Sequence, residues 1–495
     1  MNLRLTKAPG SASPLYVRFT PASPGSKPLL VRKTFLQTIM AVAISILAPI
    51  VAHADSATWE LNPGSEDWNT AANWTPMGVP NGPADIATFA LSNTTSVSIS
   101  ANTEVNGITF TAAATNPYTI TASAAFTLII SGTGITNNSG STQQFVTAVG
   151  ANGEFGLILF TNSATAGNST MFTNNGGTVS GAAGGSTVFR GSSTAASAIL
   201  VANGGSNGGA GGTILFADQS TGGTSRVELF GNGSLDISTH AASGVTIGSI
   251  EGDGDAFLGA NNLTVGSNNL STILSGVIQD GGRGGGVGGS LTKVGTGTLD
   301  LTGANTYTGN TNVNGGVLKV DGSITSNTFV NHHSTLAGTG TIHGNVTNND
   351  FGTVRPGGAP GAPGVLTVVH NYTQTQFATL MIQIAGTSTG QFSVLDVLGN
   401  ANLNGNLDPV LLNGFVPTIG DSFTFLDYAS FTGEFSHIQN QVFNHGTEQW
   451  SVIYQNNSAI LTVESHTIIP DHGSTFLLLT LGLLALVTYR QKCWH

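Results

Sequence analysis

The feature that most constrains the fold of this chain is an internal repeat. Three segments align without gaps, and they begin at Phe160 (FTNSATAGNSTMFTNNGG), Phe189 (FRGSSTAASAILVANGG) and Phe216 (FADQSTGGTSRVELFGNG). Each continues from the phenylalanine to a threonine, an apolar pair and an Asn/Gly turn, and the spacing of the copies falls within the range of known solenoid repeats. A unit of this size cannot bury its apolar face alone, but stacked copies can bury it together. The repeat predicts a solenoid, with chance similarity in a low-complexity sequence as the alternative.

The composition agrees with a β-solenoid and excludes some functions. Glycine occupies 68 of 495 positions, and only 8% of the residues are charged, against about 25% in an average soluble protein. Six of the 14 Lys and Arg residues lie before residue 34, whereas all 25 Asp and Glu residues come after residue 54. An acidic surface without a basic patch repels a polyanion, so we expect no nucleic acid partner. The lone cysteine, Cys493, lies at the extreme end, so no disulfide is expected in the body of the chain.

The N-terminal segment, 1–54, has the pattern of a secretory signal peptide. A long basic region ends at Lys33, and the apolar run FLQTIMAVAISILAPIV (35–51) precedes Ala52 and Ala54, which form a small-x-small cleavage pattern. Cleavage after Ala54 predicts an exported protein that uses the export machinery. The alternative is an uncleaved anchor, although the run is short for a membrane span.

A second signature lies at residues 291–322, LTKVGTGTLDLTGANTYTGNTNVNGGVLKVDG. Leu299 and Leu301 alternate with polar residues as in a half-buried strand, and Asn/Gly turns lead to a second strand that contains Leu318 and Val320. This stretch closely resembles the autotransporter-associated β-strand repeat of bacterial passenger domains, and RPGGAPG (355–361) resembles another passenger-domain turn. The resemblance implies an all-β fold, a right-handed parallel β-helix. We assign residues 126–370 to its coils.

Both flanks of the coils are expected to be β-rich closing modules. From Tyr372 to Val463 the sequence alternates, with Leu395, Val397 and Leu403 among the residues on one face, so we assign 371–465 to a C-terminal β module that shields the last coil. Residues 55–125 are assigned to an N-terminal β cap that contains the tryptophan cluster Trp59, Trp68 and Trp74. The alternative for the tryptophans is a platform on which carbohydrate rings stack.

The C-terminal segment, 466–495, is expected to be a sorting tail. Ile469, Pro470, Asp471, Gly473 and Ser474 precede an apolar segment at 476–489, which basic residues follow. This order resembles the exosortase-type sorting tails of Gram-negative bacteria, close to the variant with Val-Pro-Asp-Ser-Gly. Ile469 replaces the valine and His472 the serine. The resemblance implies a short transmembrane helix at 476–489 and a membrane exosortase-like partner, with a plain membrane anchor as the alternative.

No motif in the sequence specifies a catalytic or cofactor site. Glu251, Asp253 and Asp255 have glycine spacing that would suit a calcium turn, but the remaining ligand positions are apolar, so an exposed turn is expected. His332 and His333 with His343 lack the further ligands of a zinc site. The glycine-rich run at 282–286 is not followed by the Lys-Ser/Thr of a phosphate loop. We expect no catalytic residue, cofactor or metal.

These patterns lead to one preferred hypothesis and two alternatives. The preferred function is that of an exported, non-catalytic surface or extracellular-matrix protein, adhesin-like, located at the cell envelope. Extracellular polysaccharide is a candidate partner, met by many weak contacts along a Thr/Asn/Ser-rich flank. The alternatives are a polysaccharide-degrading β-helix enzyme, which would need clustered carboxylates in a groove, and a carbohydrate-binding surface protein based on the N-terminal tryptophans.

Overall fold

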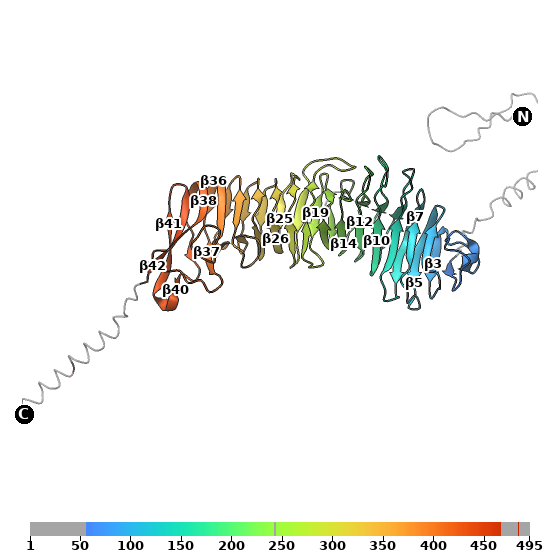
Figure 1. Ribbon diagram of the computed structural model, residues 1–495, viewed down its shortest axis with the longest axis horizontal. Helices are drawn as coiled ribbons and strands as arrows, with labels where there is room; N and C mark the ends of the chain where they lie inside the picture. Colours follow the sequence, from blue (N-terminus) through green and yellow to red (C-terminus); the bar gives the residue numbers. More distant parts are fainter. Residues whose placement is uncertain (1–55, 242–243, 467–483, 485–495) are drawn as a thin grey trace, which may run out of the picture. The chain divides into compact units, whose positions relative to one another are not determined.

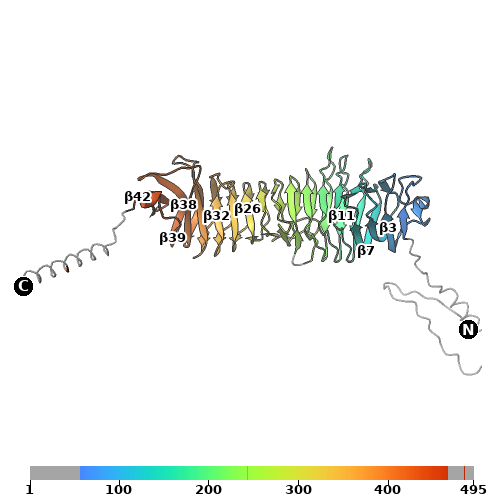
Figure 2. The same ribbon diagram turned by 90° about the horizontal axis from the view of Figure 1, so that it is seen from below.

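The computed structural model describes residues 56–241, 244–466 and 484. Within this part of the chain nearly all regular structure is β-strand, and the strands lie side by side in a continuous column from the N-terminal to the C-terminal end (Figures 1 and 2). Two short 3-10 helices, η1 (Ala71–Asn73) and η2 (Asn444–Gly446), are the helical elements among residues 56–466. The expected all-β parallel helix is confirmed.

Three sheets form the walls of the column, and neighbouring strands in each come from successive coils. Sheet 1 consists, in spatial order, of β2 (Trp74–Thr75), β1 (Ala57–Trp59), β3 (Gly82–Phe89), β5 (Thr103–Phe110), β7 (Thr127–Asn137), β9 (Leu157–Phe160), β11 (Ser186–Phe189), β13 (Thr213–Phe216), β15 (Ser234–Asp236), β18 (Asp255–Phe257) and β21 (Ile278–Gln279).

Sheet 2 spans the whole column. It consists of β4 (Ser96–Ile99), β6 (Thr119–Ala122), β8 (Gln143–Thr147), β10 (Thr170–Asn174), β12 (Ile199–Ala202), β14 (Arg226–Leu229), β17 (Ser249–Gly252), β20 (Thr272–Leu274), β23 (Thr298–Leu301), β26 (Gly316–Val320), β29 (Ser334–Gly338), β32 (Thr353–Pro356), β35 (Thr379–Ile384), β37 (Asn406–Leu411) and β39 (His437–Ile438).

Sheet 3 begins about halfway along the column and has two rows of strands that meet at β36. One row contains β16 (Val245–Ile247), β19 (Asn262–Val265), β22 (Ser290–Lys293), β25 (Thr311–Val313), β28 (Thr328–Val330), β31 (Val346–Asn348), β34 (Tyr372–Gln374) and β36 (Val394–Leu403). The other contains β24 (Ala304–Asn305), β27 (Ser323–Ile324), β30 (Thr341–Ile342) and β33 (Val365–Val368), and the closing strands are β38 (Ser422–Gly433), β40 (Val442–Phe443), β41 (Glu448–Tyr454) and β42 (Ser458–Ser465).

The repeat anchored on phenylalanine defines one coil. Phe160, Phe189 and Phe216 are paired in register in β9, β11 and β13, and their rings stack at 4.8 and 4.9 Å with interplanar angles of 9° and 11°. Thr165, Thr194 and Thr221 form a second ladder of single β-bridges. The prediction of stacked coils from these three segments is therefore confirmed at the level of register.

The coils differ in length and are short between Thr298 and Thr353. Thr298 pairs with Val317, Val317 with Thr335 and Thr335 with Thr353, so each turn here uses less chain than the turns that begin at Phe160 and Phe189. The 291–322 segment supplies strands of two consecutive short coils, β22 to β26, and Leu299 lies against Leu318. Beyond this part the coils lengthen again, since Thr353 pairs with Thr379 and Thr379 with Asn406.

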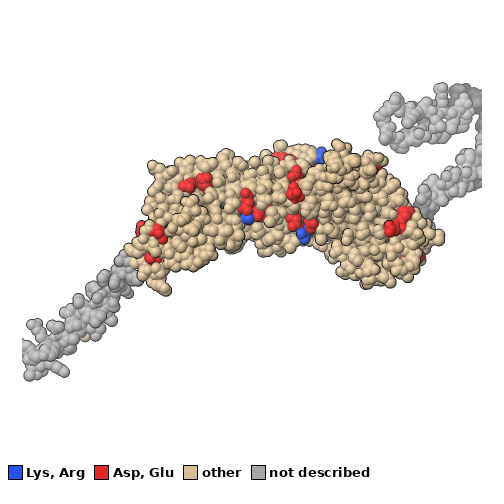
Figure 3. Space-filling view, in the orientation of Figure 1, with Lys and Arg blue, Asp and Glu red and all other residues tan. Residues whose placement is uncertain are grey.

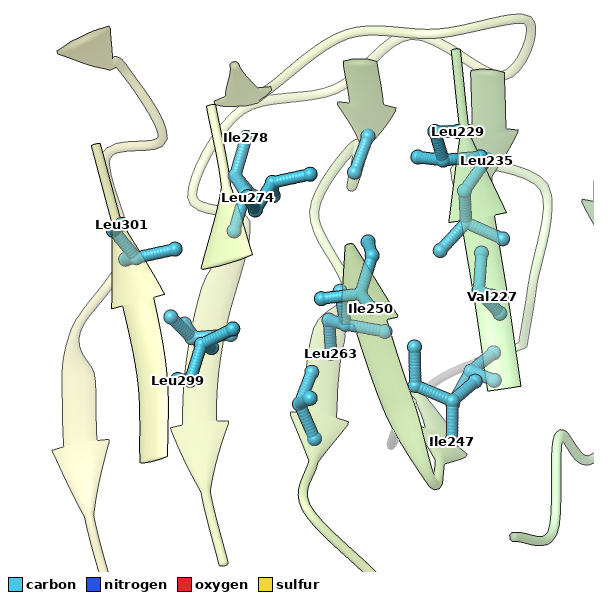
Figure 4. Packing of buried hydrophobic residues seen from close by; sticks show 14 of the residues in the cluster. Val227, Leu229, Leu235, Ile247, Ile250, Leu263, Leu274, Ile278, Leu299 and Leu301 are labelled. Carbon is cyan, nitrogen blue, oxygen red and sulfur yellow. The ribbon is translucent and has the colours of Figure 1, made fainter. Parts of the chain in front are cut away.

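Aliphatic ladders fill the interior of the column. Val227, Leu229, Ile250, Leu274 and Leu299 project inward from successive strands of sheet 2 and meet residues such as Leu235 and Leu263 from the other walls (Figure 4). Because successive residues of a strand face opposite sides, each strand gives alternate residues to the core and to the surface. Interior burial of this kind, repeated from coil to coil, needs no disulfide.

Antiparallel elements close both ends. At the N-terminal end β1 pairs antiparallel with β2 and parallel with β3, and at the C-terminal end β38, β42, β41 and β40 pair antiparallel in that order. Parallel stacking already begins with β3 and β5, before residue 126, and continues through β36 and β38, beyond residue 371. The expected alternation at Leu395, Val397 and Leu403 belongs to β36, which is one of these stacked strands. The antiparallel elements at the two ends are therefore shorter than the closing modules expected at 55–125 and 371–465.

The predictions for the two ends of the chain lie outside the described residues. This holds for the signal peptide with Ala52 and Ala54, for Ile469, Pro470, Asp471, Gly473 and Ser474, and for all of the proposed 476–489 helix except Leu484. Within the described part of the chain, no helix has both the length and the apolar character needed to cross a membrane.

Candidate functional site: polar and aromatic groups on the stack

The N-terminal tryptophans are part of the core. Trp59, Trp68 and Trp74 are each at most 1% exposed, and all three pack around Phe89 at centroid distances of 5.6 to 6.1 Å. Their indole N–H groups donate to the backbone carbonyls of Thr94, Pro80 and Trp68. Because the ring faces are covered, a carbohydrate platform built on these tryptophans is wrong. The cluster closes the first coils.

The acidic segment at 251–255 is divided among different partners. Glu251 pairs with Arg226, the Asp253 carboxylate accepts from the Gly231 amide at 2.8 Å, and Asp255 accepts from the Val277 amide at 3.0 Å. Gly252 has a φ of +106°, and a side chain there would collide with the Leu229 carbonyl. The glycine spacing that resembles a calcium turn thus has a structural cause, since it lets this strand end lie close to the previous coil.

The histidines lie apart from other metal-ligating groups. His332 and His333 contact each other edge to face at 3.9 Å, and His332 contacts Phe351 at 4.9 Å. Both are exposed, and His343 lies on the next coil after β30. Among residues 56–241, 244–466 and 484, no three His, Cys, Asp or Glu side chains come together in a way that could hold a metal ion.

Two small ion-pair clusters lie on the described surface. Arg226 lies between Glu228 and Glu251, and the Lys319 ammonium lies 2.8 Å from Asp300 and 2.5 Å from Asp321. In Figure 3 the blue patches on the lower half of the column lie against red ones, whereas a blue patch at the upper edge and several red patches lie by themselves on a largely uncharged surface. In both clusters the cation bridges to an acid of an adjacent strand, so these groups link coils together.

Lys293 is a buried cation that the sequence shows only as one position of the repeat pattern. It is 1% exposed, and its ammonium donates to the carbonyls of Val294, Gly295 and Gly315 at 2.7, 3.4 and 3.1 Å. Burial lowers the pKa of Lys293 to about 8. The lysine side chain reaches from one coil of the repeat to the next and donates hydrogen bonds to backbone carbonyls at the turns of both.

The histidine rings contact backbone carbonyls rather than nucleophilic hydroxyls. Both ring nitrogens of His240 contact backbone carbonyls, those of Ala241 and Ser220, at 2.7 Å, and Nδ1 of His466 contacts the Gly446 carbonyl at 3.0 Å. In the part of the chain that the structure describes, no hydrogen bond joins a histidine ring to a serine hydroxyl. The Ser220 hydroxyl, which lies near His240 in the fold, donates instead to the Ala217 carbonyl at 2.8 Å.

The parallel sheets and the short coils of the 291–322 segment define a parallel β-solenoid. Residues 291–320 match the passenger-associated-transport-repeat family, in agreement with the resemblance read from the sequence.

Three segments of curated proteins are similar to parts of this chain. An extracellular serine protease of Serratia marcescens is 47% identical over 78 residues, which are 16% of this chain and 7% of that protein. The adhesin BmaC autotransporter of Brucella suis biovar 1 is 38% identical over 110 residues, 22% of this chain and 3% of the adhesin. A second extracellular serine protease of Serratia marcescens is 48% identical over 54 residues, 11% of this chain and 5% of that protein. The chain therefore spans less than a tenth of the length of the curated relatives that it matches.

Proposed function

We propose that this chain is an exported, non-catalytic surface protein, adhesin-like or matrix-building, that works by presenting the long faces of its stack. The observation that carries the proposal is the parallel column, which includes a segment that matches a passenger-associated repeat, since such a column presents equivalent surface positions on successive coils. Similarity to an autotransporter adhesin supports this function. Attachment would then depend on many weak contacts made together.

Removing the gene for this chain from the bacterium that produces it tests the proposal. We expect attachment to surfaces, or incorporation of cells into their matrix, to fall, and to return when the full chain is supplied again. Fractionation should place the protein at the cell envelope or outside the cell. Unchanged attachment together with a purely internal location would contradict the proposal.

A polysaccharide-degrading or proteolytic enzyme is the second candidate, and similarity to extracellular serine proteases is the observation that favours it. The acidic segment at 251–255 does not form the carboxylate cluster that such an enzyme needs, because Glu251 pairs with Arg226 while Asp253 and Asp255 accept from backbone amides of neighbouring coils. Incubating the purified full chain with casein and with neutral and acidic polysaccharides separates the two functions. Turnover above that of a buffer control would favour the enzyme.

We further propose that the C-terminal tail acts as an exosortase-type sorting signal, with an exosortase-like membrane enzyme as partner. The order of the motif at 469–474, the apolar segment and the basic end supports this. The intact mass of protein released from the surface tests it. A new C-terminus between Ser465 and Ser474 is expected, and a released protein that still contains Cys493 would contradict it.

A further inference from the structure

One outer face of sheet 3 carries the same short pattern on five successive coils. The segments are NTNVN (310–314), NTFVN (327–331), NVTNN (345–349), NYTQT (371–375) and NANLN (400–404). Strand pairing places them in register, because Thr311 pairs with Thr328, Val346 with Tyr372, and Tyr372 with Ala401. The second and fourth residues of each segment point into the core, and the first, third and fifth point outward. We call this surface the asparagine face.

The two outer rows of the asparagine face are held in place by side-chain ladders. In the first row the Asn327 oxygen accepts from the Asn345 side-chain amide at 3.0 Å, and the Asn345 and Asn371 oxygens accept from the backbone amides of Asn371 and Asn400 at 3.1 and 2.9 Å. In the third row Asn331 donates to Asn314, and Asn349 to Asn331, both at 2.7 Å. With their oxygens engaged inside the ladder, the amide groups of Asn371 and Asn400 keep their N–H donors for solvent or a ligand.

The middle row differs from the two outer rows, because most of its side chains form no hydrogen bond from one coil to the next. The outward residues there are Asn312, Phe329, Thr347, Thr373 and Asn402, all partly or fully exposed. Asn402, at the end of the row, accepts from the Thr432 hydroxyl of the closing strand β38 at 3.2 Å. Within the described residues, the hydroxyl groups of Thr347 and Thr373 and the side chain of Asn312 form no hydrogen bond with another protein group. The ladders bond one coil to the next, whereas these donors and acceptors between them face solvent and are available to a ligand.

Aromatic side chains border the asparagine face on the turn that follows the third row. Phe351 and Phe377 are each 48% exposed, and their rings are parallel within 7° at 5.4 Å. Backbone bonds from His333 to Phe351 and from Phe351 to Phe377 keep this turn in the same register as the sheet. These exposed rings recur on successive coils, so they offer apolar contact at the spacing of the coils, about 4.8 Å, as the polar rows do.

From this arrangement we infer that the asparagine face binds an uncharged polysaccharide whose chain lies along the stack. Sugar hydroxyls both donate and accept hydrogen bonds, as do the amides and hydroxyls of the three rows, and the C–H surfaces of sugar rings suit the aromatic border. The five segments contain no Asp, Glu, Lys, Arg or His. At the aromatic border the Asp350 carboxylate accepts from the Thr375 hydroxyl at 2.6 Å, and His332 and His333 lie against Phe351. The face thus gives an acidic polymer no Lys or Arg to pair with and suits a neutral one better. The inference rests on the proposed surface function and names its ligand class.

The length of the face explains how weak contacts could hold a polymer. One hydrogen bond exchanged with water contributes little by itself. Five coils present the same groups in fixed positions, so that after the first contact the neighbouring ones form at high effective concentration. The ladders reduce the entropy lost on binding, because the side chains are already ordered.

The test compares two matched double substitutions in the full chain. Thr347→Val with Thr373→Val removes two hydroxyls from the middle row while keeping side-chain shape. Thr335→Val with Thr353→Val makes the same change on the outer face of sheet 2, where these threonines pair in register and are likewise half-buried. Retention of each protein is measured on cellulose, chitin and dextran, with alginate as the acidic polymer. Phe351→Ala with Phe377→Ala is the second variant of the face.

Retention of the unmodified chain on at least one neutral polymer is expected, together with a loss of at least about fivefold in the Thr347/Thr373 variant and little change in the Thr335/Thr353 control. Circular dichroism should show all variants folded, since no buried hydrogen bond is removed. Equal retention of the two threonine variants, binding to alginate alone, or no binding to any polymer would overturn the inference. If cells still need the chain for attachment in those cases, the proposed function stands and only the assigned ligand fails.

Discussion

At the scale of single residues, Lys293 shows how a buried charge makes stability depend on pH. The pKa of Lys293 is about 8 in the folded chain, because burial disfavours the ammonium, and near 10.4 in an unfolded one. Between these values the unfolded chain binds more protons, so stability rises with pH over this range. Burial raises the pKa of Tyr118 and of Tyr307 to about 12, so the unfolded chain ionises these tyrosines first above pH 10, and stability then falls.

Replacing Lys293 with methionine should therefore remove the rise in stability between pH 8 and pH 10. Relative to the variant, the unmodified protein should gain on the order of 1–3 kcal/mol across that interval. Urea unfolding at pH 7.5, 8.5 and 9.5 measures the difference. Parallel curves for the two proteins would show that the Lys293 ammonium is not disfavoured by its surroundings.

The sequence predicts the role of a residue where the type and spacing of the residue alone determine that role. The tryptophan cluster is predictable as a cap because large apolar rings at the open end of a stack need burial, whereas Lys293 looks like one more repeat position. The asparagine face is not visible at this scale. Asparagine is common throughout the chain, and the interval from Asn345 to Asn371 differs from that between Asn327 and Asn345 because the loop at 357–364 lengthens one coil.

At the scale of elements, the phenylalanine ladder of β9, β11 and β13 is the strongest test of the stack. Phe189 lies between Phe160 and Phe216 and is fully buried. Phe189→Ala should lower the free energy of unfolding by about 3–5 kcal/mol, since it leaves a cavity between two rings.

The matched control is Phe230→Ala, at a site that is 42% exposed in the turn after β14. This variant should change stability by no more than about 0.5 kcal/mol. Denaturant unfolding of both variants compares them. A similar cost at both sites would show that burial of Phe189 between two rings does not stabilise the stack.

Strand positions are the most predictable elements, and coil lengths the least. The phenylalanine and threonine ladders and the strands of the 291–322 segment follow from alternation and spacing, which the pleat of a strand imposes directly. The variation in coil length depends on how tightly each Asn/Gly turn folds, and turn geometry leaves a weaker trace in the sequence than burial does. The boundaries of the closing modules differ from those expected because β36 alternates like a cap strand yet pairs parallel with β33 and β34.

At the scale of the whole stack, a coil should behave as a removable unit. Deleting residues 190–216 joins Phe189 to Ala217 and takes out one complete coil, so that β11 would lie against β15 in the register that β13 now holds. In a stack whose repeats contact mainly their neighbours, such a deletion should preserve the fold and shorten the column by about 4.8 Å.

Deleting residues 190–203 provides the comparison. It removes β12 but leaves β11 and β13, so two strands of sheet 1 would follow each other without the intervening strand of sheet 2. Far-ultraviolet circular dichroism should remain β-rich for the whole-coil deletion and be lost or weakened for the partial one. If the two deletions behaved alike, stacking by complete coils would not be what organises this protein.

The inter-coil hydrogen bonds of the walls run along the stacking axis, and this has a mechanical consequence. A pull along that axis loads the bonds of every wall at one level together, so the coils part in turn, beginning with a terminal one, rather than all at once. Each coil that unwinds lengthens the chain and so lowers the tension on the coils that are still folded. If the chain acts as the surface protein proposed above, a cell attached through the middle of the column would stay tethered under flow while the outermost turns yield and rewind.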